Sequence, residues 1–540
     1  MTTPNDIDPA RPGETATARR AITIAIAWVA GAALLRAMLS SFVPLLPDET
    51  YYWLWTRQLA WGYFDHPPGI AFLIALGTSI FGDTHSGVRA GPAIAALITH
   101  AAAVLAAWHL AGRGARGAAA AARAAALVAL LPLAALGLVM ATPDAVLFMT
   151  AMIALLGVER ALAAPLRSSS SFAWWTVAGV ALGGAFIAKY TAVLLPAGLV
   201  VACIAHPALR ARFREIGPWW ASAIALAMFA PVVLWNQQHD WISFRFQFGH
   251  GFGAVAKGSA LSRELELLGG QAGLATPILF FLMAFVAWTT LRDGWRTRFT
   301  GSATDTTTRR FALAVIAIVP MMAFAISATR RSVEPNWPAL MYPAAILLLA
   351  TDRQAASHGR WWRWGMGLAA ALLLVAVAQA WRPILPLAPR KDPIARAHGW
   401  QTLAAAVDSA RHDPYMSGSG ATYIAADRYQ DASEIAFHLP GQPSVLSLNL
   451  GGRANQFDLW GTVHDKLRPG DGLVVAFDDN PAGDSLGVRV ARWFKESKPG
   501  ARVVLKRADG EVAHRKVWLY RGAIDVPPNP RALPALSAAR

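Results

Sequence analysis

Acidic and basic side chains recur in this chain next to long apolar runs, where a membrane-embedded chain usually carries neither. The acids are Asp48, Glu49, Asp65 and Asp144, and the bases are Arg89, Lys189, Arg330 and Arg331. A carboxylate can take a proton from a hydroxyl group, while Arg and Lys bind phosphate and stabilise the charge that grows on a departing one. The two residue types together suit a reaction in which a hydroxyl loses its proton while a phosphate leaves.

Each of these residues also has a simpler interpretation. Asp48 and Asp144 both follow a proline at the expected start of a helix, where an acid often caps the helix. The long cations can extend to lipid headgroups, and His66 before two prolines suits a turn. His66 and the neighbouring acids have the residue types to hold a divalent ion, but single scattered residues are poor evidence for one. We therefore assign no residue to a metal and no firm cofactor beyond a lipid-linked sugar donor, and the use of a divalent metal stays open.

The composition indicates a polytopic membrane protein. The 540 residues are 55% hydrophobic and only 15% charged, a balance that soluble globular proteins do not reach. The net charge of +16 does not indicate nucleic-acid binding, because Lys and Arg occur in short clusters between apolar runs. The single cysteine, Cys203, excludes an intrachain disulfide and a cysteine metal cluster.

Apolar runs of about 20 residues predict the membrane spans, and clusters of Lys and Arg between them predict the cytoplasmic side. We expect about eleven spans, at residues 21–43, 89–111, 127–140, 145–158, 172–188, 191–205, 219–234, 276–290, 311–326, 339–350 and 365–381. The run 70–81 is too short to cross and is expected to stay at the surface as a re-entrant or interfacial helix. Residues 1–18 are then a cytoplasmic tail, and residues 19–381 form the membrane domain.

This topology places an outer loop, residues 44–88, and all the candidate residues above on one outer membrane face. The loop holds a predicted helix near Tyr51 and Tyr52 that should lie flat in the membrane interface. Its tryptophans at positions 53, 55 and 61 are expected to be interfacial anchors. Acids and bases from several loops then converge on one surface, as expected for a site.

Residues 382–540 differ from the membrane domain in composition. Strand-like runs such as "ATYIAAD", "SVLSLNL", "GLVVAFD" and "RKVWLYRG" are separated by turn residues and by a helical "DASEIAFHL". The pattern predicts a soluble α/β domain on the outer side. The fragment "LGGRANQ" is glycine-rich, but it lacks a phosphate-loop lysine and a full dinucleotide-binding pattern, so we assign it no such role.

The reaction that these residues suggest is glycosyl transfer from a lipid-linked monophosphate sugar. The alternative is a polytopic transporter or flippase for a lipid-linked anionic substrate, and a noncatalytic scaffold for envelope assembly is a third possibility. Transporters tend to place ionisable residues near the bilayer midplane on broken helices in related halves. Here the charges lie at the ends of the predicted helices on one face, and no half-repeat is apparent.

The first outer loop resembles that of the polyprenyl-phosphate-dependent membrane glycosyltransferases, the superfamily of protein O-mannosyltransferases and lipid A aminoarabinose transferases with the GT-C fold. The matching pieces are "PDETYYW", "HPPG" before a short apolar run, "FGDTHSGVR", "TPD", "AKY", "WNQQHDWISFRFQ" and "EPNWPA". One departure is His66, where the aminoarabinose enzymes carry Lys. This difference leaves the sugar and the acceptor open.

The resemblance implies that Asp48 is the catalytic carboxylate, supported by Glu49, with Asp144 as a second acid of the site. The substrate-binding residues that we predict are Asp65, His66, Arg89, Lys189, Tyr190, Arg330, Arg331 and Asn336. The expected partners are an undecaprenyl-phosphate sugar donor, a glycan, lipid or protein acceptor, and membrane lipid. The expected location is the bacterial inner membrane, with the N-terminus cytoplasmic and the C-terminal domain periplasmic.

Overall fold

The computed structural model describes residues 12–252, 258–299, 305–352, 359–450 and 452–527. The chain forms two compact units. Unit 1 consists of Met1–Ser40, His66–Gln238 and Phe244–Ala376, and unit 2 of Ser41–Asp65, His239–Ser243 and Val377–Arg540. Among the described residues, three helices continue from one unit into the other: α1 (Pro12–Phe42), α12 (Ile242–Phe252) and α18 (Gly359–Trp381).

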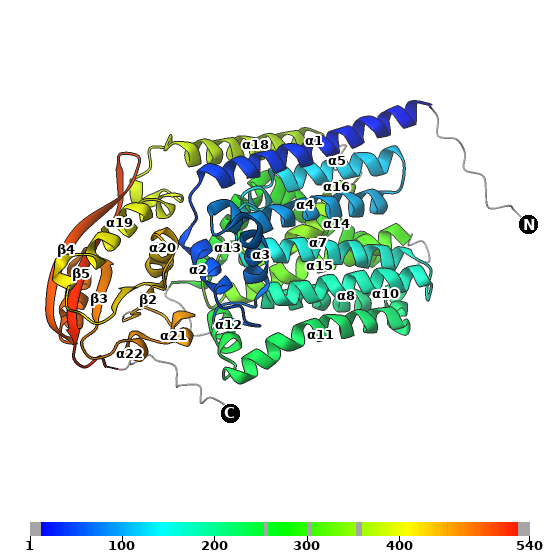
Figure 1. Ribbon diagram of the computed structural model, residues 1–540. Helices are drawn as coiled ribbons and strands as arrows, with labels where there is room; N and C mark the ends of the chain where they lie inside the picture. Colours follow the sequence, from blue (N-terminus) through cyan, green and yellow to red (C-terminus); the bar gives the residue numbers. More distant parts are fainter. Residues whose placement is uncertain (1–11, 253–257, 300–304, 353–358, 451, 528–540) are drawn as a thin grey trace, which may run out of the picture. The chain divides into compact units, whose positions relative to one another are not determined.

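The regular elements of unit 1 are all helices among its described residues (Figure 1). Besides most of α1, α12 and α18, its helices are α3 (Gly69–Phe81), α4 (His85–Ala111), α5 (Ala115–Leu130), α6 (Pro132–Gly137), α7 (Pro143–Ala163), α8 (Ser169–Ala188), α9 (Leu194–Ala205), α10 (Pro207–Arg210), α11 (Ile216–Gln238), α13 (Ala260–Ala275), α14 (Pro277–Thr297), α15 (Asp305–Ala328) and α16 (Tyr342–Thr351). Short 3₁₀ turns lie at Tyr190–Val193, Ala211–Arg214 and Trp337–Met341.

Among the described residues, eight helices are long and apolar enough to cross a membrane, or nine if the bent pair Tyr190–Ala205 and Pro207–Arg214 is one span. The predicted polytopic helical fold is therefore confirmed. The other two of the eleven predicted spans do not meet this criterion: one corresponds to the short apolar stretch Trp337–Thr351, and the other to the end of α5 together with α6. The short surface helix predicted at 70–81 is present as α3.

One predicted helix was wrong in its bounds. The run 127–140 was expected to form a single helix, but α5 begins at Ala115 and ends at Leu130, and a separate α6 follows. Pro132 ends the first helix because it lacks an N–H and starts the next one at its first position. The alanine-rich stretch before Leu127 is weakly apolar, so the hydropathy pattern did not reveal that it is helical.

Small residues allow the helices of unit 1 to pack closely. A Cβ atom added at Gly157 on α7 would lie 2.8 Å from the backbone nitrogen of Ala178 on α8. On the other side of α8, a Cβ at Gly179 would lie 2.6 Å from Cα of Ala221 on α11. Backbones that approach this closely are typical of helix pairs within membranes, where small residues replace larger apolar side chains at the contact.

Unit 2 contains an α/β domain. Its elements are α2 (Pro47–Thr56), α19 (Trp400–Arg411), β1 (Thr422–Ala426), α20 (Tyr429–His438), β2 (Leu446–Ser447), α21 (Phe457–Trp460), α22 (Val463–Lys466), β3 (Gly472–Asp478), α23 (Pro481–Ala491), β4 (Phe494–Arg507) and β5 (Gly510–Ala523). The sheet order is β2-β1-β3-β5-β4. β1 pairs in parallel with β2 and β3, whereas β5 pairs antiparallel with β3 and β4.

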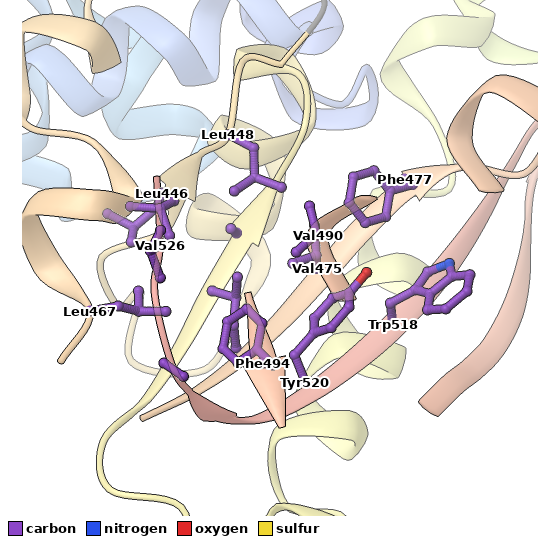
Figure 2. Packing of buried hydrophobic residues seen from close by; sticks show 14 residues of the cluster. Leu446, Leu448, Leu467, Val475, Phe477, Val490, Phe494, Trp518, Tyr520 and Val526 are labelled. Atoms are coloured by element: carbon purple, nitrogen blue, oxygen red, sulfur yellow. The ribbon is translucent and has the colours of Figure 1, made fainter. Parts of the chain in front are cut away.

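One face of this sheet carries the core of the α/β domain. Figure 2 shows Val475 of β3 and Tyr520 of β5 beside Val490 of α23 and Phe494 of β4. The rings of Phe494 and Tyr520 lie 5.2 Å apart, and the Tyr520 hydroxyl donates to the carbonyl of Gly487 at 3.0 Å. The sheet is therefore held by apolar packing, with the buried hydroxyl satisfied.

Helix α2, from the first outer loop, packs against α20 of the α/β domain within the same unit. The ring of Trp53 meets that of Phe437 edge-on at 5.0 Å, and Trp55 stacks on Tyr63 at 4.2 Å. Trp53 and Trp55 are both fully buried. Their predicted role as interfacial anchors was therefore wrong, because protein rather than lipid covers their rings, whereas Trp61 is half-exposed.

Candidate active site

In unit 1, Asp144 brings together two of the predicted substrate-binding residues. Asp144 lies in the first turn of α7, after Pro143. The Lys189 ammonium donates to Asp144 Oδ1 at 2.8 Å, and the Asn336 amide donates to Asp144 Oδ2 at 2.7 Å. The three residues come from positions far apart in the chain: the start of α7, the end of α8 and the turn before Trp337–Met341.

The geometry of this cluster suits the binding of an anion. The side chains of Lys189 and Asp144 are 10% and 18% exposed, so the ion pair is largely desolvated. An ammonium group has three donors, and Asp144 takes one of them. Lys189 can therefore donate to a phosphate oxygen while Asp144 holds it in place.

Tyr190, next to Lys189, is positioned by a residue that we did not predict. The amide of Asn236, a fully buried residue of α11, donates to the Tyr190 hydroxyl at 3.3 Å. The carbonyl oxygen of the same side chain accepts the N–H of Phe244 at 3.3 Å. The fragment "WNQQHD" pointed to this region, although not to Asn236 itself.

The other predicted residues of unit 1 are placed differently. Arg89 is 2% exposed in the first turns of α4. Arg330 is exposed, and Arg331 donates to the backbone carbonyl of Gly249 on α12. His66 is partly exposed at the start of the second segment of unit 1. Their role in substrate binding stays a prediction.

In unit 2, Asp48 pairs with a residue of the C-terminal part of the chain. Arg396, in the 3₁₀ turn Ala395–Ala397, donates to Asp48 Oδ2 at 2.8 Å. The two side chains are 59% and 42% exposed, so the carboxylate remains accessible to solvent. Dense protein around it raises the pKa of Asp48 above its usual value, and Arg396 is the main cause that opposes this rise. A carboxylate with a raised pKa is a stronger base than an ordinary aspartate.

The neighbouring Glu49 has a structural partner. Its side chain is fully buried, and its Oε2 accepts the backbone N–H of Leu46 at 3.0 Å, just before α2 begins. This bond satisfies a donor at the N-terminus of the helix, where backbone N–H groups have no partner within the helix. Glu49 therefore fixes the start of the helix that carries Asp48, and its predicted catalytic role stays a prediction.

Asp65, at the end of the loop segment in unit 2, is held on two sides. The Tyr51 hydroxyl donates to Asp65 Oδ2 at 2.6 Å, and Arg453 donates to Oδ1 at 2.7 Å. Asp65 is only 4% exposed, and Arg453 also lies over the ring of Tyr429. Burial and the Asp65 carboxylate both raise the pKa of Tyr51, so its hydroxyl stays protonated and keeps donating.

Gln456 also binds the loop segment, through two hydrogen bonds. Its backbone N–H donates to the Tyr51 hydroxyl at 2.8 Å, and its side-chain oxygen accepts the N–H of Phe64 at 2.7 Å. Gln456 and Arg453 belong to the fragment "LGGRANQ", which follows β2. In open α/β sheets the carboxyl ends of parallel strands are the usual place for ligands. Here that edge binds the outer loop.

Sequence reasoning missed Arg396, Arg453 and Gln456, which position the loop residues. The glycines of "LGGRANQ" were a signal for an unusual loop, but nothing in the fragment named its partner. Asp48 lies in unit 2 and Asp144 in unit 1, and their convergence in one cleft stays a prediction. Among the described residues, no three His, Cys, Asp or Glu side chains are grouped as metal ligands.

The helical bundle and the α/β domain resemble those of membrane glycosyltransferases with the GT-C fold, and comparison with known proteins points to the same class. A family model described as dolichyl-phosphate-mannose-protein mannosyltransferase matches residues 65–235. Lipid A galacturonosyltransferase RgtD of Rhizobium johnstonii is 27% identical over 367 residues, which cover 67% of this chain and 71% of the relative.

Solved structures show the same fold. ArnT from Cupriavidus metallidurans superposes with a TM-score of 0.59 in its apo state and 0.61 when bound to undecaprenyl phosphate. In both cases the identity is 16%, and the match covers 93% of this chain and 99% of ArnT. The resemblance to polyprenyl-phosphate-dependent membrane glycosyltransferases, predicted from the first outer loop, is confirmed.

Proposed function

We propose that this protein transfers a sugar from a polyprenyl-monophosphate carrier to a hydroxyl group of an envelope lipid, glycan or protein. The transfer takes place on the outer face of the bacterial inner membrane. Such a carrier is bound by ArnT in its complex with undecaprenyl phosphate, and RgtD is named for transfer to lipid A. The N-terminus of the chain is cytoplasmic in this proposal, and the α/β domain is periplasmic.

The observation that carries the proposal is the setting of Asp48. Its carboxylate is accessible, has a raised pKa, and stands at the first turn of a helix whose opposite face is buried against α20. A general base needs this combination of a fixed position, contact with substrate and a pKa closer to neutral. Asp48 is therefore the base that accepts the proton of the acceptor hydroxyl.

The reaction follows from the two residue types. The acceptor oxygen attacks the anomeric carbon of the sugar, and the bond from that carbon to the phosphate oxygen breaks. The proton of the acceptor passes to Asp48, and the carrier leaves as its phosphate monoester. Lys189, held by Asp144, stabilises the negative charge that develops on this phosphate, and the buried guanidinium of Arg89 adds to the positive field.

The test is a transfer assay with the purified full-length protein and a labelled polyprenyl-phosphate sugar. We expect carrier phosphate to appear only when an acceptor is present. Asp48→Asn should lower the rate by about 10²- to 10⁴-fold, the typical cost of losing a positioned base. Asp408→Asn, on α19 of the same unit, is the control and should be active.

Full turnover by the Asp48→Asn variant would remove Asp48 from the mechanism. Movement of intact labelled lipid across a vesicle membrane, without release of carrier phosphate, would contradict the glycosyltransferase proposal. It would favour the alternative, a transporter or flippase.

A further inference from the structure

The segment that follows α18 exposes apolar and cationic side chains together. We call residues Arg382–Lys391 the exit segment. Helix α18 is long and apolar enough to span a membrane and ends at Trp381, so the exit segment begins where the chain leaves the apolar layer. Its large apolar side chains are substantially exposed: Ile384 by 54%, Leu385 by 40% and Leu387 by 43%.

The charged residues of the exit segment are all cationic: Arg382, Arg390 and Lys391. All three are exposed. Within the described part of the chain, no salt bridge involves any of them, unlike Arg396, which pairs with Asp48. The exit segment therefore offers three cations, without an acid among them, beside exposed apolar side chains.

The backbone of the exit segment exposes few N–H groups. Proline supplies no donor at positions 383, 386 and 389. The side-chain oxygen of Gln379 accepts the N–H groups of Ile384 and Leu385, each at 2.9 Å, and the N–H of Leu387 bonds to the Leu385 carbonyl at 2.8 Å. A backbone with its donors removed or satisfied can enter an apolar layer without a desolvation penalty at those positions.

A buried polar cluster fixes both ends of the exit segment. Gln379, Asp392 and Arg507 are each less than a tenth exposed. The Gln379 amide donates to Asp392 at 2.7 Å, and Arg507 of β4 donates to Asp392 and to the carbonyl of Gln379. The exposed apolar side chains therefore lie on a segment of backbone that is held at both ends.

We infer that the exit segment is a docking surface for anionic membrane lipids. Its apolar side chains enter the boundary between headgroups and acyl chains, and its three cations bind the headgroup phosphates. Apolar area and positive charge on one short element are the features of interfacial lipid binding. This inference does not depend on the proposed glycosyl transfer.

The first test measures depth in the membrane. Cys203 is the single cysteine of the chain and is buried, so a Cys203→Ser background permits one nitroxide label at a chosen site. We expect a label at Leu387→Cys, in vesicles of phosphatidylcholine and phosphatidylglycerol, to collide with oxygen far more than with a water-soluble nickel chelate. A label at Val488→Cys on α23, which is 54% exposed, is the control and should show the opposite preference.

The second test measures charge selectivity through labelling of the protein by photoactivatable phosphatidylglycerol in competition with phosphatidylcholine. Replacing Arg382, Arg390 and Lys391 with Gln should lower the preference for phosphatidylglycerol at the exit segment by up to about fivefold per charge, since each cation near an anionic surface contributes roughly that factor. The control removes three exposed cations elsewhere in unit 2, with Arg492, Lys495 and Lys506 changed to Gln, and should leave the preference unchanged.

A water-exposed label at position 387 would overturn the inference. A protein would then be the remaining partner for the exposed apolar side chains of the exit segment. Equal labelling of the exit segment by the two lipids in the unsubstituted protein would also overturn it. Because neither readout involves sugar transfer, a failed transfer assay and a failed docking test remain distinguishable.

Discussion

Replacing Arg396 with Gln should raise the pKa of Asp48, the proposed base, and shift the pH dependence of transfer. The guanidinium lies 2.8 Å from the carboxylate and stabilises its charged form. Desolvation by the surrounding protein already raises this pKa above that of an ordinary aspartate, and Arg396 is the largest opposing cause. Without the cation, Asp48 keeps its proton to a higher pH. Because a base acts only when deprotonated, the acidic limb of kcat/KM should move upward in pH.

The exposure of the pair sets the size of this shift. The side chains are 59% and 42% exposed, so solvent screens their attraction. Exposed ion pairs contribute about 0.2–1 kcal/mol, and one pKa unit corresponds to about 1.36 kcal/mol, so the limb should move by roughly 0.1–0.7 pH units. The plateau of kcat/KM at higher pH should change less, because Asp48 is deprotonated there in both the variant and the unsubstituted protein.

The assay is the initial rate of carrier-phosphate release across the acidic range, with the limb fitted to a single ionisation. Arg521→Gln is the matched control, because Arg521 pairs at 2.7 Å with Glu496 in the same unit. Its limb should coincide with that of the unsubstituted protein. A limb that moves downward in pH, or that stays fixed while the control also stays fixed, would mean that a group other than Asp48 titrates in the acidic range.

Three further changes test the rest of the site. Lys189→Met should lower kcat/KM by about 10²- to 10³-fold, as for loss of one donor to a developing oxyanion, and normal kinetics with the carrier substrate would contradict this role. Gln456→Leu removes the acceptor of the Phe64 N–H and should lower kcat/KM by up to about 10²-fold through a misplaced loop, and kinetics equal to those of the unsubstituted protein would contradict this role. Trp53→Ala leaves a cavity against Phe437 and should cost about 3–5 kcal/mol in the unfolding free energy of unit 2, measured by denaturant titration. A loss below about 1 kcal/mol would show that α2 contributes little to the packing of this unit.

The sequence predicted those parts of the fold that follow from long apolar runs or alternating strands. Helices α3 and α15 and strands β1 and β3 were predicted for this reason. Strand β4, "FKESKPGARVVLKR", was missed because Lys, Glu and Arg interrupt its apolar pattern. The strand lies at the edge of the sheet, where charged residues are common because they discourage pairing with other chains. Its charge therefore reflects its position in the sheet, which the sequence does not reveal.

The site was predictable in its residue types but not in its pairings. Asp144 and Lys189 were both predicted, and the structure joins them. The partners of Asp48 and Asp65 were not predicted, because Arg396 and Arg453 are separated from them by 348 and 388 residues. An arginine on a soluble domain is ordinary by itself, and only the folded sheet edge shows that it faces a loop from the start of the chain.

The dependence of α2 on the α/β domain follows from its length. A ten-residue helix is too short to be stable by itself in water, since isolated helices below about 12–15 residues are marginal. What stabilises it is the burial of Trp53 and Trp55, and the fully buried hydroxyl of Tyr51, which bonds both to Asp65 and to the backbone of Gln456. The carboxylate of Asp48 therefore has a fixed position only when the C-terminal domain is folded and packs against its helix. The position of this proposed base is thus encoded largely in residues that follow α18, rather than in the loop that carries it.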